Sequence, residues 1–109
     1  MNIIKATLND LEAVAHLFNA YREFYQQSSD IAGAKKFIEQ RLIQMDSTIF
    51  LAIQEYPSQS VGFTQLYPLF SSVQMSRIYL LNDLYVDSHY RERLINHPYL
   101  QSIKYAKGI

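Results

Sequence analysis

The stretch RIYLLNDLYV, residues 77–86, decides how this chain folds. From Ile78 onward its side chains are apolar at odd and even positions alike, apart from Asn82 and Asp83. A strand with two apolar faces is typical of the interior of a sheet, where both faces are covered. We therefore predict that residues 77–86 form a strand buried inside a sheet.

The chain before this stretch predicts a strand followed by a helix. The opening MNIIKAT, residues 1–7, has the composition of a short strand, and Thr7 with Asp10 three places on resembles a capping box. A helix is predicted from there to about Gln27, because apolar side chains recur at spacings of three and four. These side chains are Leu11, Val14, Ala15, Phe18, Tyr21 and Tyr25.

A second helix and a hairpin are predicted next. Asp30 is a plausible N-cap for a helix that runs to about Asp46, and Gly33 in its first turn weakens that helix slightly. Its apolar positions are Ile31, Ala34, Ile38, Leu42 and Met45. From Ser47 the period changes, and TIFLAIQ (48–54) and VGFTQLYP (61–68), joined by EYPSQS (55–60), predict two paired strands. A polar connection, FSSVQMS (70–76), completes the order β-α-α-β-β-β.

Composition predicts one soluble domain over residues 1–109. The chain has 109 residues, 49% of them hydrophobic, which suffices for a single core. Ten basic and ten acidic residues cancel, so the charge favours neither nucleic acid nor an anionic membrane as a partner. There is no cysteine, and no apolar run approaches the roughly 20 residues that span a bilayer. We expect a cytoplasmic protein.

Few residues are candidates for chemistry by type and spacing alone. Asp83 interrupts the most apolar strand, where a carboxylate must be hydrogen-bonded, paired or poised at a cleft. It either stabilises a local backbone irregularity, pairs with an arginine such as Arg77, or holds a cationic amine. The spacing of His16, His89 and His97 does not favour a metal site. The chain contains neither a G-x-S-x-G elbow nor a G-x-x-x-x-G-K-[ST] loop, so hydrolase and nucleoside triphosphatase functions lack their usual motifs.

The phrase RIYLLNDLYVDSHYRER, residues 77–93, resembles the GNAT superfamily of acyl-CoA N-acyltransferases. ATLNDLEAVAHLFNAYREFY (6–25) is similar to the first helix of that family, and VGFTQLYPLFSS (61–72) to the strand before its central strand. The resemblance covers about residues 1–93. It implies a partial GNAT fold of class α/β (α+β), with a mixed, mostly antiparallel sheet.

The resemblance also implies a function and a cofactor. GNAT enzymes transfer an acetyl group from acetyl-CoA, here to a small-molecule amine or an amino terminus. The backbone of Leu84, Tyr85 and Val86 would contact the pantetheine arm, while Arg91 and Arg93 would lie at the pyrophosphate. The resemblance assigns no catalytic residue, because the tyrosine that often protonates the leaving thiolate lies in a part of the family absent from these 109 residues.

The residues after Arg93 depart from the family pattern. Where the family has R/Q-x-x-G-x-G/A, this chain has RERLIN, residues 91–96, so both glycine positions are lost. Leu94 in a left-handed conformation costs about 1 kcal/mol or more. Pro98 fits the first turn of a short C-terminal helix that stops at Gly108. The alternative is therefore a truncated, catalytically inactive remnant that acts at most as a binding or dimerisation module.

A further expectation concerns the edge of strand 77–86. Without its usual neighbour, this strand presents unpaired backbone groups, which proteins rarely leave open. We expect it to be covered by the 94–108 tail or paired across a homodimer.

Overall fold

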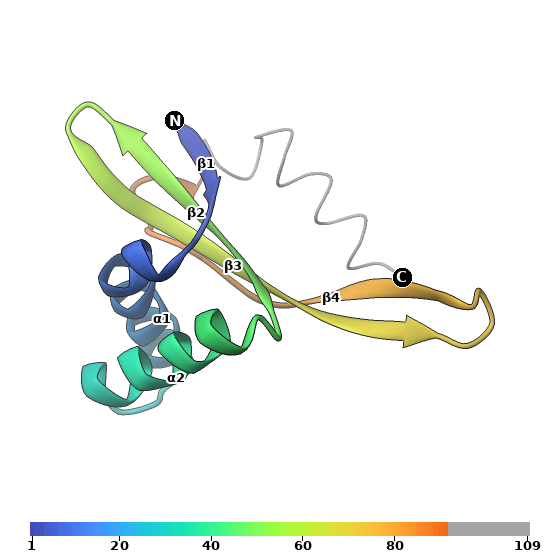
Figure 1. Cartoon of the computed structure of the whole chain (residues 1–109). Coiled ribbons are helices and arrows are strands. Elements are labelled where there is room, and N and C mark those ends of the chain that lie inside the picture. Colours follow the sequence, from blue (N-terminus) through green and yellow to red (C-terminus); the bar gives the residue numbers. More distant parts are fainter. Residues whose placement is uncertain (92–109) are drawn as a thin grey trace.

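The computed structural model describes residues 1–91 and confirms the predicted α+β fold and order of elements (Figure 1). The elements are β1 (Asn2–Lys5), a 3-10 turn (Leu8–Asp10), α1 (Leu11–Phe24), α2 (Ile31–Gln44), β2 (Thr48–Glu55), β3 (Ser58–Ser71) and β4 (Ser76–Val86). The predicted helix near 98–108 lies outside the described residues.

The strands form one sheet in the order β1-β2-β3-β4, and each neighbouring pair is antiparallel. Within residues 1–91, β4 is therefore an edge strand, although its two apolar faces predicted a strand buried inside a sheet. The pattern arises because β4 contributes to apolar clusters on both faces of the sheet. Leu81 and Val86 belong to one cluster, and Tyr85 packs against the other.

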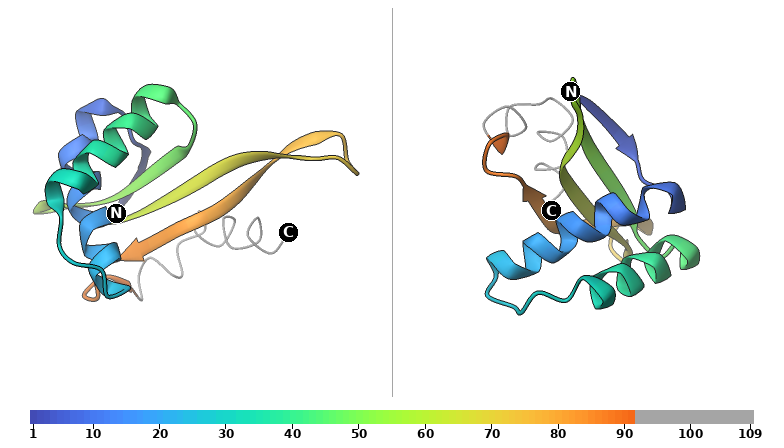
Figure 2. Two further views of the ribbon diagram at one scale, coloured as in Figure 1. Left: turned by 90° about the horizontal axis from the view of Figure 1, so that it is seen from below. Right: turned by 90° about the vertical axis from the view of Figure 1, so that its left-hand side faces the viewer.

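Helices α1 and α2 pack against one face of the sheet, as the two views of Figure 2 show. The cluster on this helix side consists of Ala6, Leu11, Val14, Ile38, Ile49, Leu51 and Phe63. The opposite face carries a smaller cluster of Ala52, Val61, Leu66, Leu81 and Val86. No helix within residues 1–91 is both long enough and apolar enough to cross a membrane.

Local side chains cap the helices as the sequence predicts. Thr7 and Asp10 form the capping box, with the Thr7 backbone N–H donating to Asp10 Oδ2 at 2.9 Å. Asp30 Oδ1 accepts the backbone N–H of Gly33 at 2.9 Å and caps α2. Helix α1 ends at Phe24, earlier than predicted, and Gln26 then adopts a left-handed conformation with φ of 65°.

The β3–β4 hairpin extends beyond the rest of the sheet as a two-stranded arm (Figure 1). Strand β2 pairs with β3 only as far as Leu66, while β3 and β4 stay paired out to Ser71 and Ser76. Strand β3 is thus longer than predicted and takes in Phe70 and Ser71 from the stretch predicted as a connection. The arm exposes apolar side chains: Leu69, Phe70, Val73, Met75, Tyr79 and Leu80.

Candidate functional site

Asp83 lies in β4 on the helix side of the sheet and is only 5% exposed. Its Oδ2 accepts a hydrogen bond from Gln65 Nε2 at 2.6 Å, and its Oδ1 accepts one from Asn82 Nδ2 at 3.0 Å. Gln65 is fully buried, and its Oε1 accepts the hydroxyl of Ser47 at 2.8 Å. The buried carboxylate is therefore held by neutral donors, which offset part of its desolvation cost.

The predicted pairing of Asp83 with Arg77 is wrong. Arg77 lies six residues back along β4, roughly 20 Å away at the rise of an extended strand. Its guanidinium instead stands over the Phe70 ring, 5.4 Å from the ring centroid. The alternative that Asp83 stabilises a local irregularity agrees with its contacts, because it bonds to Asn82 at a β-bulge.

The bulge is a single extra residue in β4. Gln65 pairs with Asp83 and Leu66 with Leu81, so Asn82 has no partner in β3. Thr64 Oγ1 donates to the backbone carbonyl of Asp83 at 2.8 Å and ties the bulge to β3 from the opposite face. An extra residue of this kind bends the strand and raises its local twist.

Two tyrosines border Asp83. Burial, followed by the charge and hydrogen bonding of Asp83, raises the pKa of Tyr21 to about 12. The pKa of Tyr67 is raised as well, first by burial and then by the Asp83 charge. Both phenols are therefore neutral near pH 7, and together with Asp83 they form a polar group beneath the helix layer.

The backbone after the bulge alternates between β3 and the outer edge. Asp87 donates its N–H to the Val61 carbonyl at 2.8 Å, so residue 87 faces β3. Because direction alternates along an antiparallel strand, Tyr85 also faces β3, whereas Leu84 and Val86 turn their N–H and C=O groups to the outer edge. In the described part of the chain, no strand pairs with that edge.

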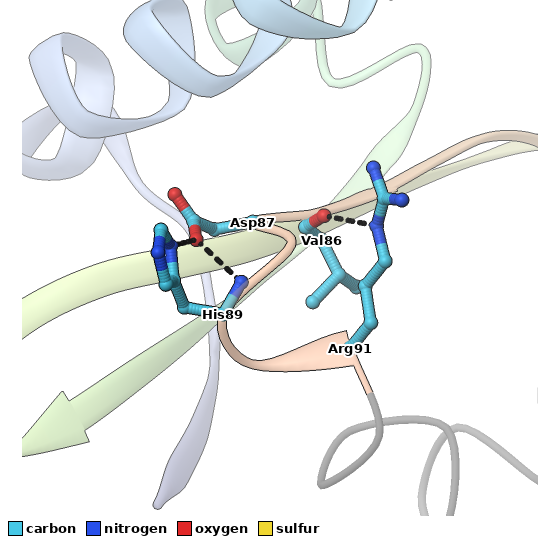
Figure 3. A network of polar contacts seen from close by, with 4 residues as sticks. All are labelled: Val86, Asp87, His89 and Arg91. Carbon is cyan, nitrogen blue, oxygen red and sulfur yellow. Dashed lines mark hydrogen bonds and ion pairs between the residues drawn. The ribbon is translucent and has the colours of Figure 1, made fainter.

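A tight turn, residues 87–91, follows β4 and places Arg91 against this edge (Figure 3). Asp87 Oδ1 accepts the backbone N–H of His89 at 2.9 Å and contacts its Nδ1 at 3.0 Å. These contacts, the backbone one first, lower the pKa of Asp87. Arg91 Nε donates to the Val86 carbonyl at 3.0 Å, and its guanidinium lies 5.6 Å from the Phe24 ring centroid.

The structure thus brings four of the predicted cofactor residues together: Leu84, Tyr85, Val86 and Arg91. Arg93, like Leu94 and Asn96 of the altered turn, lies outside the described residues. The sequence pattern did not indicate that Gln65, Ser47 and Tyr21 are neighbours of Asp83. The available signal was a glutamine between Phe63 and Tyr67 on the helix side of β3, where a buried amide needs a polar partner.

A separate hollow of about 320 Å³ lies between α1 and α2. It is lined by Phe18, Arg22, Asp30, Gly33, Ala34 and Phe37. Arg22 is bonded to the Ser28 carbonyl and Asp30 caps α2, so both polar groups already stabilise the helix connection.

Comparison with known proteins identifies relatives, although no family model matches the chain. The chain is 53% identical over 93 residues to the uncharacterized N-acetyltransferase YhfO of Bacillus subtilis, covering 85% of this chain and 61% of the relative. It is 33% identical over 89 residues to a probable acetyltransferase of Haemophilus influenzae, covering 82% and 60%. The chain therefore spans about three fifths of the length of these two relatives.

Solved structures are similar over nearly the whole chain. The crystal structure of a probable acetyltransferase has a TM-score of 0.85 and 42% identity, covering 95% of this chain and 69% of that one. A predicted acetyltransferase of Clostridium acetobutylicum, crystallised with acetyl-CoA, has a TM-score of 0.64 and covers 93% and 75%. At 11% identity the second likeness concerns the fold alone.

Proposed function

Because the chain belongs to the GNAT superfamily of N-acetyltransferases, we propose that it binds acetyl-CoA along the outer edge of β4 and acetylates an amine. The observation that carries the proposal is that Leu84 and Val86 turn their backbone N–H and C=O groups to the outer edge of β4, and that Arg91 lies beside them. An acceptor amine on a small molecule or an amino terminus matches the chemistry of the family.

The edge of β4 suits an extended ligand that carries amide groups. The N–H and C=O of Leu84 and the N–H of Val86 could bond to the pantetheine amides as a neighbouring strand would. The Val86 carbonyl already accepts Arg91 Nε, so it is the least available of these groups. Tyr85 faces β3 with its backbone, so in our proposal it contributes its side chain instead.

Arg91 suits the phosphate end of the cofactor. A guanidinium has five N–H donors, and the bond to Val86 uses one of them. Its position over the Phe24 ring limits its movement, so its remaining donors are oriented before a ligand arrives. Charge-assisted bonds from arginine to phosphate are among the strong ones in proteins.

The acceptor amine must lose a proton during acetyl transfer. Acetyl-CoA supplies an activated acetyl group when bound: an N–C bond forms, the thioester C–S bond breaks, and the leaving thiolate gains a proton. In our proposal a base or an ordered water removes the amine proton, and backbone donors polarise the carbonyl. Asp83 is the candidate for holding the amine, since a carboxylate has about four acceptor positions and Gln65, Asn82 and the Tyr21 hydroxyl use three of them.

Calorimetric titration of the 109-residue chain with acetyl-CoA tests the proposal. Saturation in the micromolar range is the expected result. An absence of heat at millimolar acetyl-CoA would instead support the alternative of an inactive remnant.

A further inference from the structure

The β-bulge at Asn82 determines which backbone groups of β4 face the outer edge. Continuing the pairing of Leu81 with Leu66 without an extra residue would place Asp83 opposite Thr64 and Tyr85 opposite Gly62. Because side chains and backbone groups alternate with period two, this one-residue slip would reverse every position after Asn82. Asp83 and Tyr85, instead of Leu84 and Val86, would then present their N–H and C=O groups to the edge.

We propose that the hydrogen-bonded chain Ser47–Gln65–Asp83–Asn82 is a register lock that holds this bulge and so fixes Leu84 and Val86 at the outer edge.

Burial of apolar side chains alone does not favour one of the two registers over the other. In the observed register Tyr85 packs on the helix side, Val86 is buried on the opposite face, and Leu84 stays 36% exposed. The slipped register would move Leu84 and Val86 to the helix side and Tyr85 to the opposite face. Each register buries apolar side chains, so the hydrophobic effect gives no decisive preference.

The polar side chains favour the observed register over the slipped one. In the slipped register Asp83 would leave Gln65 for the face that carries Val61, Leu66 and Leu81. Thr64 would offer one hydroxyl there, in place of the amides of Gln65 and Asn82. A buried carboxylate with fewer donors carries a large free-energy cost, which disfavours the slip.

Gln65 is suited to this role because its amide orientation is fixed. A carboxylate only accepts hydrogen bonds, so Nε2 must point to Asp83 and Oε1 must point away from it. Ser47 Oγ donates to Oε1 and thereby satisfies the other end. Gln65 is fully buried, so water does not replace either partner.

The test measures NMR nuclear Overhauser effects (NOEs), called contacts below, between α-protons of β3 and β4 in the full 109-residue chain. Non-hydrogen-bonded pairs bring opposite Cα atoms to about 4.5 Å, which gives strong contacts. The wild type should show Thr64 with Leu84 and Gly62 with Val86. In Asp83→Leu the strong contacts should instead join Thr64 with residue 83 and Gly62 with Tyr85. Asn82 would then lie opposite Gln65 and could take the place of Asp83 as its hydrogen-bond partner.

Three further variants separate a register lock from general stabilisation. Asp83→Asn retains an acceptor for Gln65 and should keep the wild-type contacts. Ile49→Val removes a methyl group from the buried core of β2 and should also keep them. Deleting Asn82 in the Asp83→Leu background removes the extra residue, so the regular pairing should restore the contacts of Leu84 and Val86.

Two outcomes overturn the inference. One is an Asp83→Leu protein that keeps the wild-type contacts. The other is a double variant, lacking Asn82, that fails to regain them. If Asp83→Leu alone does not fold, the double variant decides, because a conflict of register predicts that the deletion restores folding.

The consequence for the cofactor rests on the proposed function. Acetyl-CoA affinity should fall at least tenfold in Asp83→Leu and return when Asn82 is deleted. If the wild type does not bind acetyl-CoA, the proposed function fails, while the α-proton contacts still decide the register lock.

Discussion

Asp83 keeps a carboxylate beneath the helix layer because Gln65 and Asn82 each donate a hydrogen bond to one of its oxygens. Arg91, eight residues later, donates a hydrogen bond to the Val86 carbonyl, and its guanidinium lies over the Phe24 ring. These two contacts hold it beside the outer edge of β4. In our proposal these two residues mark the acceptor end and the phosphate end of the candidate site. The Arg91 and Asp83 ends can be tested separately by substitution.

Arg91→Met should weaken acetyl-CoA binding roughly 10- to 100-fold, the equivalent of losing one charge-assisted hydrogen bond of about 1.5–3 kcal/mol. Acetyl-pantetheine, which lacks the nucleotide phosphates, should bind the wild type and Arg91→Met with equal affinity. Arg77→Met, which removes a similar guanidinium from the distant arm, is the matched control. Equal losses for both ligands would contradict a phosphate contact.

The Tyr21 phenol should titrate near pH 12, in a resolved NMR titration of its ring. Its pKa is raised in the folded state, so its contribution to stability is complete below the unfolded value near 10. That contribution is then lost as the pH rises through about 12. Asp83→Asn should leave the pKa between these values, because burial persists when the charge is removed. An unchanged pKa in Asp83→Asn would show that Asp83 does not act on Tyr21.

At the scale of elements, the sequence predicted features that depend on neighbours along the chain. Thr7 and Asp30 cap the helices through residues three places away, so their patterns were visible locally. The bulge at Asn82 was not visible, because it depends on Gln65 and Ser47, which are distant in sequence. The length of the β3–β4 arm was missed for the same reason: Phe70 and Ser71 are strand residues only because β4 pairs with them.

Gly33→Ala tests the cap of α2. Alanine normally favours a helix interior over glycine by about 1 kcal/mol, but a β-carbon here would collide with the Asp30 carboxylate. Loss of the cap costs about 1 kcal/mol, so the unfolding free energy should stay nearly unchanged.

Chemical denaturation of a double-mutant cycle measures this coupling. Asp30→Ala alone should cost about 1 kcal/mol, and Gly33→Ala added to it should recover the full helix-propensity gain. Lys36→Ala, at an exposed α2 position, is the control with little expected change. Strictly additive effects would contradict a clash between residues 30 and 33.

For the whole molecule, the apolar arm and the outer edge of β4 lie on the same hairpin (Figure 1). We propose, as the sequence suggested, that a second copy pairs with this edge between Ile78 and Asn82, which leaves the backbone groups of Leu84 and Val86 to acetyl-CoA. A two-fold axis would make the two β4 strands antiparallel, like every pair in the described sheet. Between Ile78 and Asn82 the strand carries no charge that would oppose such pairing.

Sedimentation velocity should therefore show a concentration-dependent dimer. Leu80→Lys places a charge in the middle of the edge and should give a monomer. Ile43→Lys adds the same charge to an exposed position of α2 and should leave the dimer intact. A wild-type chain that stays monomeric at every concentration would rule out the second copy as the partner of this edge.

The most direct test of the proposed function follows the backbone amides of β4 by NMR while acetyl-CoA is added. The amide signals of Leu84 and Val86 should shift strongly and saturate together, whereas that of Tyr85, which faces β3, should shift less. Saturation that leaves Leu84 and Val86 unchanged, or that affects Tyr85 most, would contradict binding of acetyl-CoA along the outer edge of β4.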